Sequence, residues 1–181
     1  NRTAGIREMR RELSEDITKK LRQNMVQNFN VNVEELILAG VTLALNNWET
    51  SDIRCIDIEN QGRMIDGIKC ANDRTIGWFT MIYPFAIEKS HKNVLNTILS
   101  VKEEKASIHQ HMHEYGVLYR LGLGEEQLHK RSAILFNYLG VLDDEYHSNE
   151  MFMASEYPIG NCMDLCKAPV YPITVDCSII K

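Results

Sequence analysis

The sequence predicts a single α/β unit in which a β-sheet is packed by helices. Apolar residues recur at helical spacing in some segments and alternate at strand spacing in others, and the two kinds of segment follow one another along the chain. No internal repeat and no low-complexity linker divides it. The 181 residues, 44% of them hydrophobic, suffice for one domain core or for one lobe of a larger domain.

Two helices are expected near the amino end. The first runs over residues 14–29, with Ser14 as a plausible N-cap and an apolar stripe at every fourth position: Ile17, Leu21, Met25 and Phe29. The second begins at Asn32, which forms a capping-box pattern with Glu35. Its apolar residues cover most of the helix circumference, so we expect it to be well buried.

A strand is expected over residues 53–59. Alternation puts Ile56 and Ile58 on one face, and Cys55, Asp57 and Glu59 on the other. Two carboxylates and a thiol are unusual on the face of a core strand. This face therefore either meets water or lines a cavity.

Residues 73–88 are apolar and rich in aromatic side chains, including Trp78 and Phe79, and they predict one or two buried strands with a bend. A third helix is expected over 90–105, a break over 109–113, and further helical segments over 115–121 and 125–131. Strands are predicted over 133–139 and 171–180. Residues 142–169 lack periodicity and are interpreted as a long excursion.

Charge and cysteine content exclude several functions. The net charge is −5 and no cluster of lysine and arginine is present, which argues against a nucleic-acid partner. No apolar run approaches transmembrane length, and the charged start has no apolar signal core, so no membrane association is expected. The five cysteines are odd in number and form no CxxC pair, which favours reduced thiols in the cytoplasm.

Four segments share motifs with one family. Residues 74–80 read Arg-Thr-Ile-Gly-Trp-Phe-Thr, and 136–140 read Phe-Asn-Tyr-Leu-Gly. Glu59, Gly62 and Arg63 match a Glu-Gly-His-Gly-Arg motif, from which Asn60 and Gln61 depart. Residues 101–118, which contain Tyr115 and Gly116, keep the spacing of a further motif but lack its central Pro-Asn-Lys-Gly. Together these segments resemble the condensation superfamily of nonribosomal peptide synthetases, in particular its epimerization-type branch.

The resemblance implies a fold like that of chloramphenicol acetyltransferase. Such domains have two similar lobes with the active site in the tunnel between them, each a mixed β-sheet packed by helices in a two-layer sandwich. The chain contains no His-His pair, whereas the family carries a His-His-x-x-x-Asp-Gly motif on the first lobe. We therefore expect residues 1–181 to be a single C-terminal lobe without its N-terminal partner, inactive alone.

The implied reaction inverts the α-carbon of an aminoacyl or peptidyl thioester. The substrate is held on the phosphopantetheine arm of a carrier protein, so a carrier domain is the expected partner and no directly bound cofactor is expected. Inversion needs a base and an acid on opposite faces of the α-carbon, and the match to the family assigns Glu59 to one of these roles. Partial burial would raise the pKa of Glu59 and suit it to proton exchange near neutral pH.

By the same resemblance Asn137 and Tyr138 lie in the catalytic pocket, where their amide and hydroxyl donate to the enolate oxygen or orient the thioester. The expected lining of the substrate channel comprises Gly62, Arg63, Trp78, Thr80, Tyr115 and Gly116.

Structural roles remain open for the same residues. Glu59 is also interpretable as a solvated carboxylate at a strand end, Asn137 as a turn former and Tyr138 as a core aromatic. Alternation would put Asn137 and Tyr138 on opposite faces of a strand, and Arg63 is also a candidate structural partner for an acid. A condensation domain, which joins two carrier-bound groups through an amide bond, and a degenerate module that only docks carriers stay as alternative functions.

The alternating His109, His111 and His113 would share a face on a strand and so could bind zinc. The helical pattern on both sides argues against a strand there, and a polar loop near the tunnel mouth is the interpretation adopted. Cys162 and Cys166 are four residues apart without a matching ligand pair, so no metal site is predicted.

Overall fold

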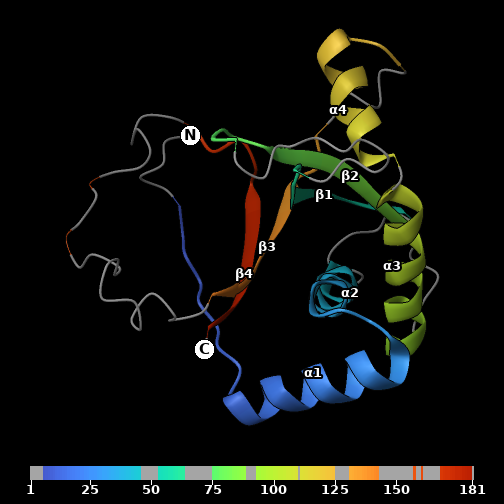
Figure 1. Ribbon diagram of the computed structural model, residues 1–181, viewed down its shortest axis with the longest axis vertical. Helices are drawn as coiled ribbons and strands as arrows, with labels where there is room; N and C mark the ends of the chain where they lie inside the picture. Colours follow the sequence, from blue (N-terminus) through green and yellow to red (C-terminus); the bar gives the residue numbers. More distant parts are fainter. Residues whose placement is uncertain are drawn as a thin grey trace.

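The computed structural model describes residues 6–45, 53–63, 75–88, 93–109, 111–124, 131–142, 157, 160 and 168–180. The elements in this part of the chain, in order, are α1 (Glu15–Phe29), α2 (Val33–Leu45), β1 (Ile53–Gln61), β2 (Thr80–Glu88), α3 (Val94–His109), α4 (Met112–Leu121), β3 (Ile134–Leu142) and β4 (Ile173–Ile180) (Figure 1). None of the helices described is long and apolar enough to span a bilayer.

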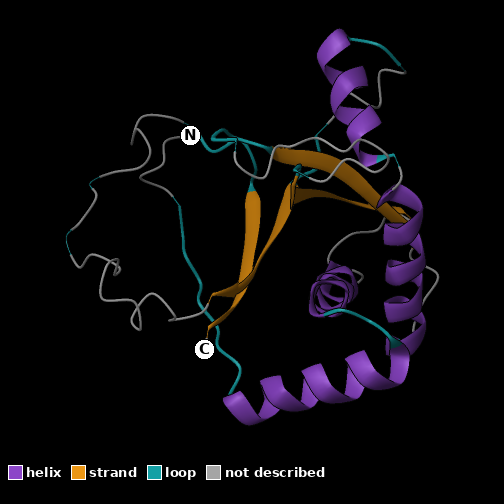
Figure 2. Ribbon diagram, viewed as in Figure 1, coloured by secondary structure: helices purple, strands orange, loops and turns teal. Residues whose placement is uncertain are grey.

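The strands form one mixed sheet in the order β2-β1-β3-β4. β1 pairs with β2 antiparallel and with β3 parallel, and β3 pairs with β4 parallel. Helices α2 and α3 lie together on one side of this sheet (Figure 2). The predicted fold class, a mixed sheet packed by helices in two layers, is therefore confirmed.

The core fills the space between the sheet and these two helices. Ile56 and Ile58 of β1 are fully buried, and this apolar face is continued by Phe85 of β2 and Phe136 of β3. Side chains of α2 and α3, led by Leu38 and Val101, pack against it. The opposite face holds the polar residues of β1, as the alternation predicts.

The local helix signals are confirmed. The Asn32 backbone amide donates to Glu35 Oε2, and the Glu35 amide donates to Asn32 Oδ1, both at 2.8 Å. This reciprocal pair is a capping box, and it starts α2 one residue after Asn32. The burial expected for α2 is confirmed on one face only: Leu38, Ala39, Thr42 and Leu45 are buried, whereas Gly40 and Ala44 are exposed.

The prediction of a buried strand over residues 73–88 is wrong for its first part. Only Thr80–Glu88 form β2, while residues 75–79 are not strand and Trp78 is 88% exposed. Residues 75–79 are held at the end of β1 by hydrogen bonds from Gly62 and Arg63 to their backbone carbonyls, and not by burial. Pro84 is tolerated within β2 because this is an edge strand.

The boundary between the third and fourth helices also differs from the prediction. α3 continues to His109, and α4 begins at Met112 rather than at Tyr115. His111 forms the turn between them. Of the predicted helical segment 125–131 only Arg131 is described, and most of the excursion 142–169 lies outside the described residues.

Candidate functional site

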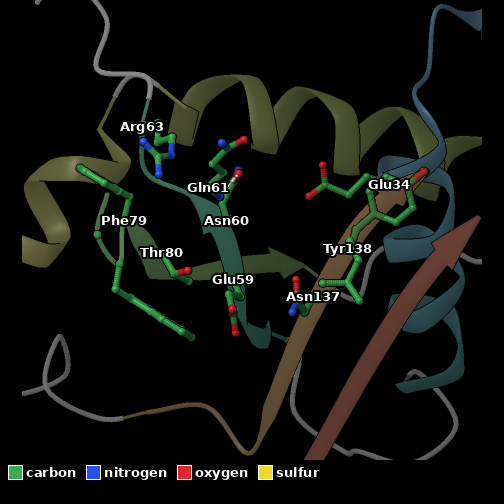
Figure 3. Close-up of a pocket in the computed structure, with 13 residues that line it drawn as sticks. Glu34, Glu59, Asn60, Gln61, Arg63, Phe79, Thr80, Asn137 and Tyr138 are labelled. Carbon is green, nitrogen blue, oxygen red and sulfur yellow. Dashed lines mark hydrogen bonds between the residues drawn. The ribbon is translucent and has the colours of Figure 1, made fainter. Parts of the chain in front are cut away.

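A cleft lies at the carboxyl ends of the parallel strands β1 and β3. It has a volume of about 490 Å³ and is lined by Glu34, Glu59, Asn60, Gln61, Arg63, Gly77, Trp78, Phe79, Thr80, Asn137, Tyr138, Leu139 and Gly140. Figure 3 shows these side chains converging from β1, β3 and the segment before β2. Open α/β sheets bind ligands at this end of their parallel strands, which makes the cleft the candidate site.

Glu59 and Asn137 form the centre of the cleft. The two residues are direct partners in the parallel pairing of β1 and β3, so their side chains leave the same face of the sheet. Figure 3 shows them side by side. Burial is the larger cause that raises the pKa of Glu59, and the negative charge of Asp176 raises it further. A carboxylate with a raised pKa beside an amide is suited to accept and return a proton.

Tyr138 reaches the same cleft from the other face of β3. Its hydroxyl side faces helix α2, where Glu34 lies, and burial is the main cause that raises its pKa. Both residues line the cleft. The regular pairing of β3 with β4 breaks just beyond them, between Tyr138 and Val141, where Gly140 has a positive φ of 80°. The cleft is therefore lined from both faces of β3, although Asn137 and Tyr138 alternate along the strand.

Glu34 is held in the cleft wall by an ion pair. Its carboxylate lies 2.6 Å from Nζ of Lys105, and both side chains are largely buried. This pair joins the start of α2 to α3. It also offsets the negative charge of Glu34, so Glu34 acts mainly as a wall residue.

The opposite wall is built from the segment before β2. The backbone amide of Gly62 donates to the carbonyl of Phe79 at 2.9 Å, and the Arg63 guanidinium stacks 4.2 Å from the centre of the Phe79 ring. Arg63 Nη1 also donates to the Thr75 carbonyl at 3.0 Å. These contacts place Trp78 and Phe79 over the cleft.

Gly62 is required by this close approach. A Cβ at this position would lie 2.1 Å from the Phe79 carbonyl oxygen, far inside van der Waals contact. The residue therefore supports the wall from behind and is not itself part of the lining. Arg63, Trp78 and Thr80, predicted as channel residues, do line the cleft.

Tyr115 and Gly116 lie elsewhere, on α4, and are not among the lining residues. Burial is the main cause that raises the pKa of Tyr115, followed by the charge of Asp57. Asp57 is 2% exposed and accepts a hydrogen bond of 2.7 Å from the Tyr171 hydroxyl. The channel role of Tyr115 and Gly116 therefore stays a prediction. The charge nearest in effect to Tyr115 is that of Asp57, a buried residue of β1.

Two charged residues near Glu59 were not predicted from the sequence. Glu34 is brought to the cleft by the packing of α2, and Asp176 by the pairing of β4 with β3. Neither position carries a local sequence signal. Phe79, Leu139 and Gly140, by contrast, belong to the motifs that drew attention to this region.

The three alternating histidines do not share a strand. His109 ends α3, His111 precedes α4 and His113 lies within α4. His111 Nδ1 and Glu114 Oε1 are 3.1 Å apart. Within the described parts of the chain no group of three His, Cys, Asp or Glu side chains is arranged to hold a metal ion.

Comparison with known proteins finds large synthetases. Chondramide synthase cmdD of Chondromyces crocatus is 31% identical over 145 residues, which make up 79% of this chain and 4% of that protein. Tyrocidine synthase 1 of Brevibacillus parabrevis is 30% identical over 165 residues, or 88% of this chain and 15% of that protein. The chain thus spans only a small part of the relatives that it matches.

Solved structures share the fold. The epimerization domain from the third module of tyrocidine synthetase B superposes with a TM-score of 0.76 at 24% identity, over 93% of this chain and 38% of that one. The first condensation domain of the CDA synthetase gives a TM-score of 0.51 at 15% identity, over 66% of this chain and 27% of that one. The condensation-domain fold expected from the motifs is therefore confirmed.

The family model for the condensation domain matches residues 2–172. With the synthetase relatives and the shared fold, this match shows that the chain belongs to the condensation-domain family of nonribosomal peptide synthetases.

Proposed function

We propose that the chain is part of a domain that epimerizes an aminoacyl or peptidyl group from L to D. In this proposal the group is bound as a thioester to the phosphopantetheine arm of a carrier protein in the cytoplasm. The observation that carries the proposal is the pairing of Glu59 with Asn137 at the centre of the cleft. Epimerization needs a proton acceptor there, and Glu59 is a partly buried carboxylate with a raised pKa.

The chemistry proceeds by removal and return of the α-proton. The α-carbon–hydrogen bond breaks, its proton passes to the Glu59 carboxylate, and the electron pair moves onto the thioester oxygen as an enolate. Asn137 and Tyr138 carry an amide and a hydroxyl on the lining of the same cleft, and these donate hydrogen bonds to the developing negative charge. An acid on the opposite side then protonates the α-carbon to give the other configuration.

The opposite acid belongs, in this proposal, to the N-terminal lobe of the domain. Glu59, Asn137 and Thr80 form an open polar wall to which a second lobe would add the facing wall. The family's His-His motif would supply the acid there. We therefore expect these 181 residues alone to show no turnover.

Two alternatives remain as competing proposals. A condensation domain would use the cleft to join two carrier-bound groups, and it has no need of a carboxylate at Glu59. A carrier-docking module would keep the fold and perform no chemistry. The Glu59–Asn137 pair and the fold match to an epimerization domain over 93% of the chain favour epimerization.

The test uses the intact two-lobe domain and a carrier loaded with an L-aminoacyl group. We expect D-product and exchange of the α-proton with solvent deuterium, and we expect Glu59→Gln to lower both by at least about a hundredfold. Glu103→Gln is the matched control, because Glu103 is an exposed glutamate on α3. Exchange that survives Glu59→Gln unchanged would exclude the proposed role. Amide product with a second loaded carrier would favour condensation, and carrier binding without turnover would favour the docking module.

A further inference from the structure

Three polar residues stand in one row across neighbouring strands. Glu59 of β1 is the register partner of Asn137 of β3, which is in turn the register partner of Asp176 of β4. The pairing of β3 with β4 is regular from Ile134 to Tyr138, so no irregularity interrupts the row. Paired residues on adjacent strands point to the same face of a sheet, so all three side chains share one face.

The row lies on the face away from the core. The preceding register positions, Ile58, Phe136 and Val175, carry the apolar side chains that face the helices. Neighbouring strands are about 4.8 Å apart, so Asp176 lies about 10 Å from Glu59 between Cα atoms. At this distance two charges still interact when the space between them is partly shielded from water.

Other acidic side chains near Glu59 are bonded to other residues. On its own strand, Asp57 accepts a hydrogen bond from the Tyr171 hydroxyl through Oδ2, while its buried Oδ1 has no partner among the described residues. In the cleft wall, Glu34 is paired with Lys105. Among the described residues, Asp176 is a carboxylate on this face for which no hydrogen bond or ion pair is recorded.

The remaining neighbours of Glu59 do not supply a negative charge. Its partner on β2 is Ile82, and its partner on β3 is the neutral Asn137. Cys55 lies further back on the same face of β1. Arg63, the cation of the cleft lining, is engaged with the Phe79 ring and the Thr75 carbonyl.

Asn137 is suited to stand between the two carboxylates. Its amide has both donor hydrogens and an acceptor oxygen, so it can donate to an ionised Glu59 and accept from a protonated one. The Asn137 amide can therefore form a hydrogen bond with either protonation state of Glu59, and it does not favour one state over the other. The charge that favours the protonated state comes from the next strand.

We propose that Asp176 is a positioning residue for the proposed epimerization, whose negative charge on the same sheet face favours the protonated form of Glu59 once the proton has been transferred. Asp176 does not touch the substrate and acts through Glu59. The inference rests on the proposed function, because it concerns the group that would move the proton. Burial is the larger cause that raises the pKa of Glu59, and the negative charge of Asp176 raises it further, in the direction that this geometry requires.

The test measures the pH profile of kcat/KM for α-proton exchange in the intact two-lobe domain. Because the ionised carboxylate is the base, kcat/KM rises with pH as Glu59 loses its proton. Removing the charge with Asp176→Asn lowers the pKa of Glu59, so we expect this rising limb to move to lower pH. We expect Asp176→Glu, which keeps the charge, to restore the limb to its original position.

Two controls separate charge from structure. Ser178→Asn introduces the same side chain on an exposed position of the same strand face without changing the charge, and we expect no shift. Raising the salt concentration screens an exposed carboxylate, so the difference between the native domain and Asp176→Asn should shrink. A rearranged strand would give neither the rescue by glutamate nor this salt dependence.

A second measurement does not depend on turnover. The carboxyl 13C signal of Glu59, assigned through Glu59→Gln, is followed against pH in the domain without its carrier. A midpoint that stays unchanged in Asp176→Asn, or that moves equally in Ser178→Asn, would overturn the inference and leave the proposed function intact. A midpoint that moves while Glu59→Gln retains full exchange would overturn the proposed function instead.

Discussion

Gly62 is the position where the structure makes its sharpest prediction. Its backbone amide donates to the Phe79 carbonyl at 2.9 Å, which ties the end of β1 to the segment that carries Trp78. In Gly62→Ala the new Cβ would lie 2.1 Å from that carbonyl oxygen and 2.6 Å from Met81 Cγ. The Met81 side chain can move aside, but the carbonyl is backbone, so the two segments must separate.

The cost follows from two changes. Overpacking of this kind costs about 1–3 kcal/mol, and the lost backbone hydrogen bond costs about 0.5–1.5 kcal/mol. The alanine offsets about 0.4–1 kcal/mol of this by restricting the unfolded chain. The net loss is therefore about 2.3 kcal/mol at the middle of the range, which lowers Tm by about 5–9 °C for a protein of this size.

Calorimetry of Gly62→Ala beside Gly40→Ala checks this reasoning. Gly40 lies within α2 and is exposed, and a Cβ added there would meet nothing within 4 Å. Alanine there favours the helix by about 1 kcal/mol, so we expect Tm to rise. A Gly62→Ala protein that melts within one or two degrees of the native chain would refute the close approach of the two segments. Loss of α-proton exchange in the intact domain should accompany the fall in Tm, because Trp78 and Phe79 would leave the cleft wall.

Three further predictions concern stability and the cleft. Gly116→Ala should raise Tm, because a Cβ there also meets nothing within 4 Å and alanine favours the helix. If Gly116 lines the substrate channel, this stabilised variant should nevertheless lose α-proton exchange in the intact domain. Tyr171→Phe removes the donor to the buried Asp57 and should lower the free energy of unfolding, measured by urea denaturation, by about 1.5–3 kcal/mol. Tyr83→Phe is the control, because the Tyr83 hydroxyl bonds the neutral Asn60 amide, and it should lower that free energy by only about 0.5–1.5 kcal/mol. Equal losses in the two variants would contradict this. Burial raises the pKa of Glu59 above its ordinary 4.5, so the native chain loses stability as the pH rises through that pKa. Glu59→Gln should therefore gain Tm over the native chain toward neutral pH and lose this advantage below the ordinary glutamate pKa, and a pH-independent difference would contradict the shift.

Local patterns were enough to predict most elements of the fold. The capping box at Asn32 and Glu35 determines where α2 starts, and both of its hydrogen bonds connect residues three apart in the sequence. Alternation in β1 likewise depends only on neighbours. The segment before β2 was mispredicted because apolar composition was taken as burial. Trp78 is apolar but lies over a cleft, and Gly62 and Arg63, more than ten residues away, hold its segment there.

In the site, too, residues within short motifs were predictable, whereas residues brought together by the fold were not. Glu59, Asn137 and Tyr138 were identified by motif, and all three line the cleft. Asp176 and Glu34 were missed, because strand pairing and helix packing bring them near from distant parts of the chain.

The two departures from the Glu-Gly-His-Gly-Arg motif have different consequences in the structure. Asn60 is engaged locally, since its Oδ1 accepts the Gln61 backbone amide at 2.6 Å and its side chain meets Tyr83. Gln61 lines the cleft and puts a non-titrating amide where the family has an imidazole.

In the proposed reaction, proton transfer on this wall depends on one group. Among the titratable residues described in the lining, Glu34 is bound to Lys105, Arg63 donates to the Thr75 carbonyl, and burial raises the pKa of the Tyr138 hydroxyl above its ordinary value. Glu59 is left as the carboxyl group on this wall whose pKa is raised by burial and by the charge of Asp176, and the proposed function assigns the proton transfer to it. One such group can exchange an α-proton on a single face, but inversion needs a second on the opposite face. If the chain serves an epimerase, the second group must come from the facing lobe, so exchange with solvent and formation of D-product should be separable by mutating one lobe at a time.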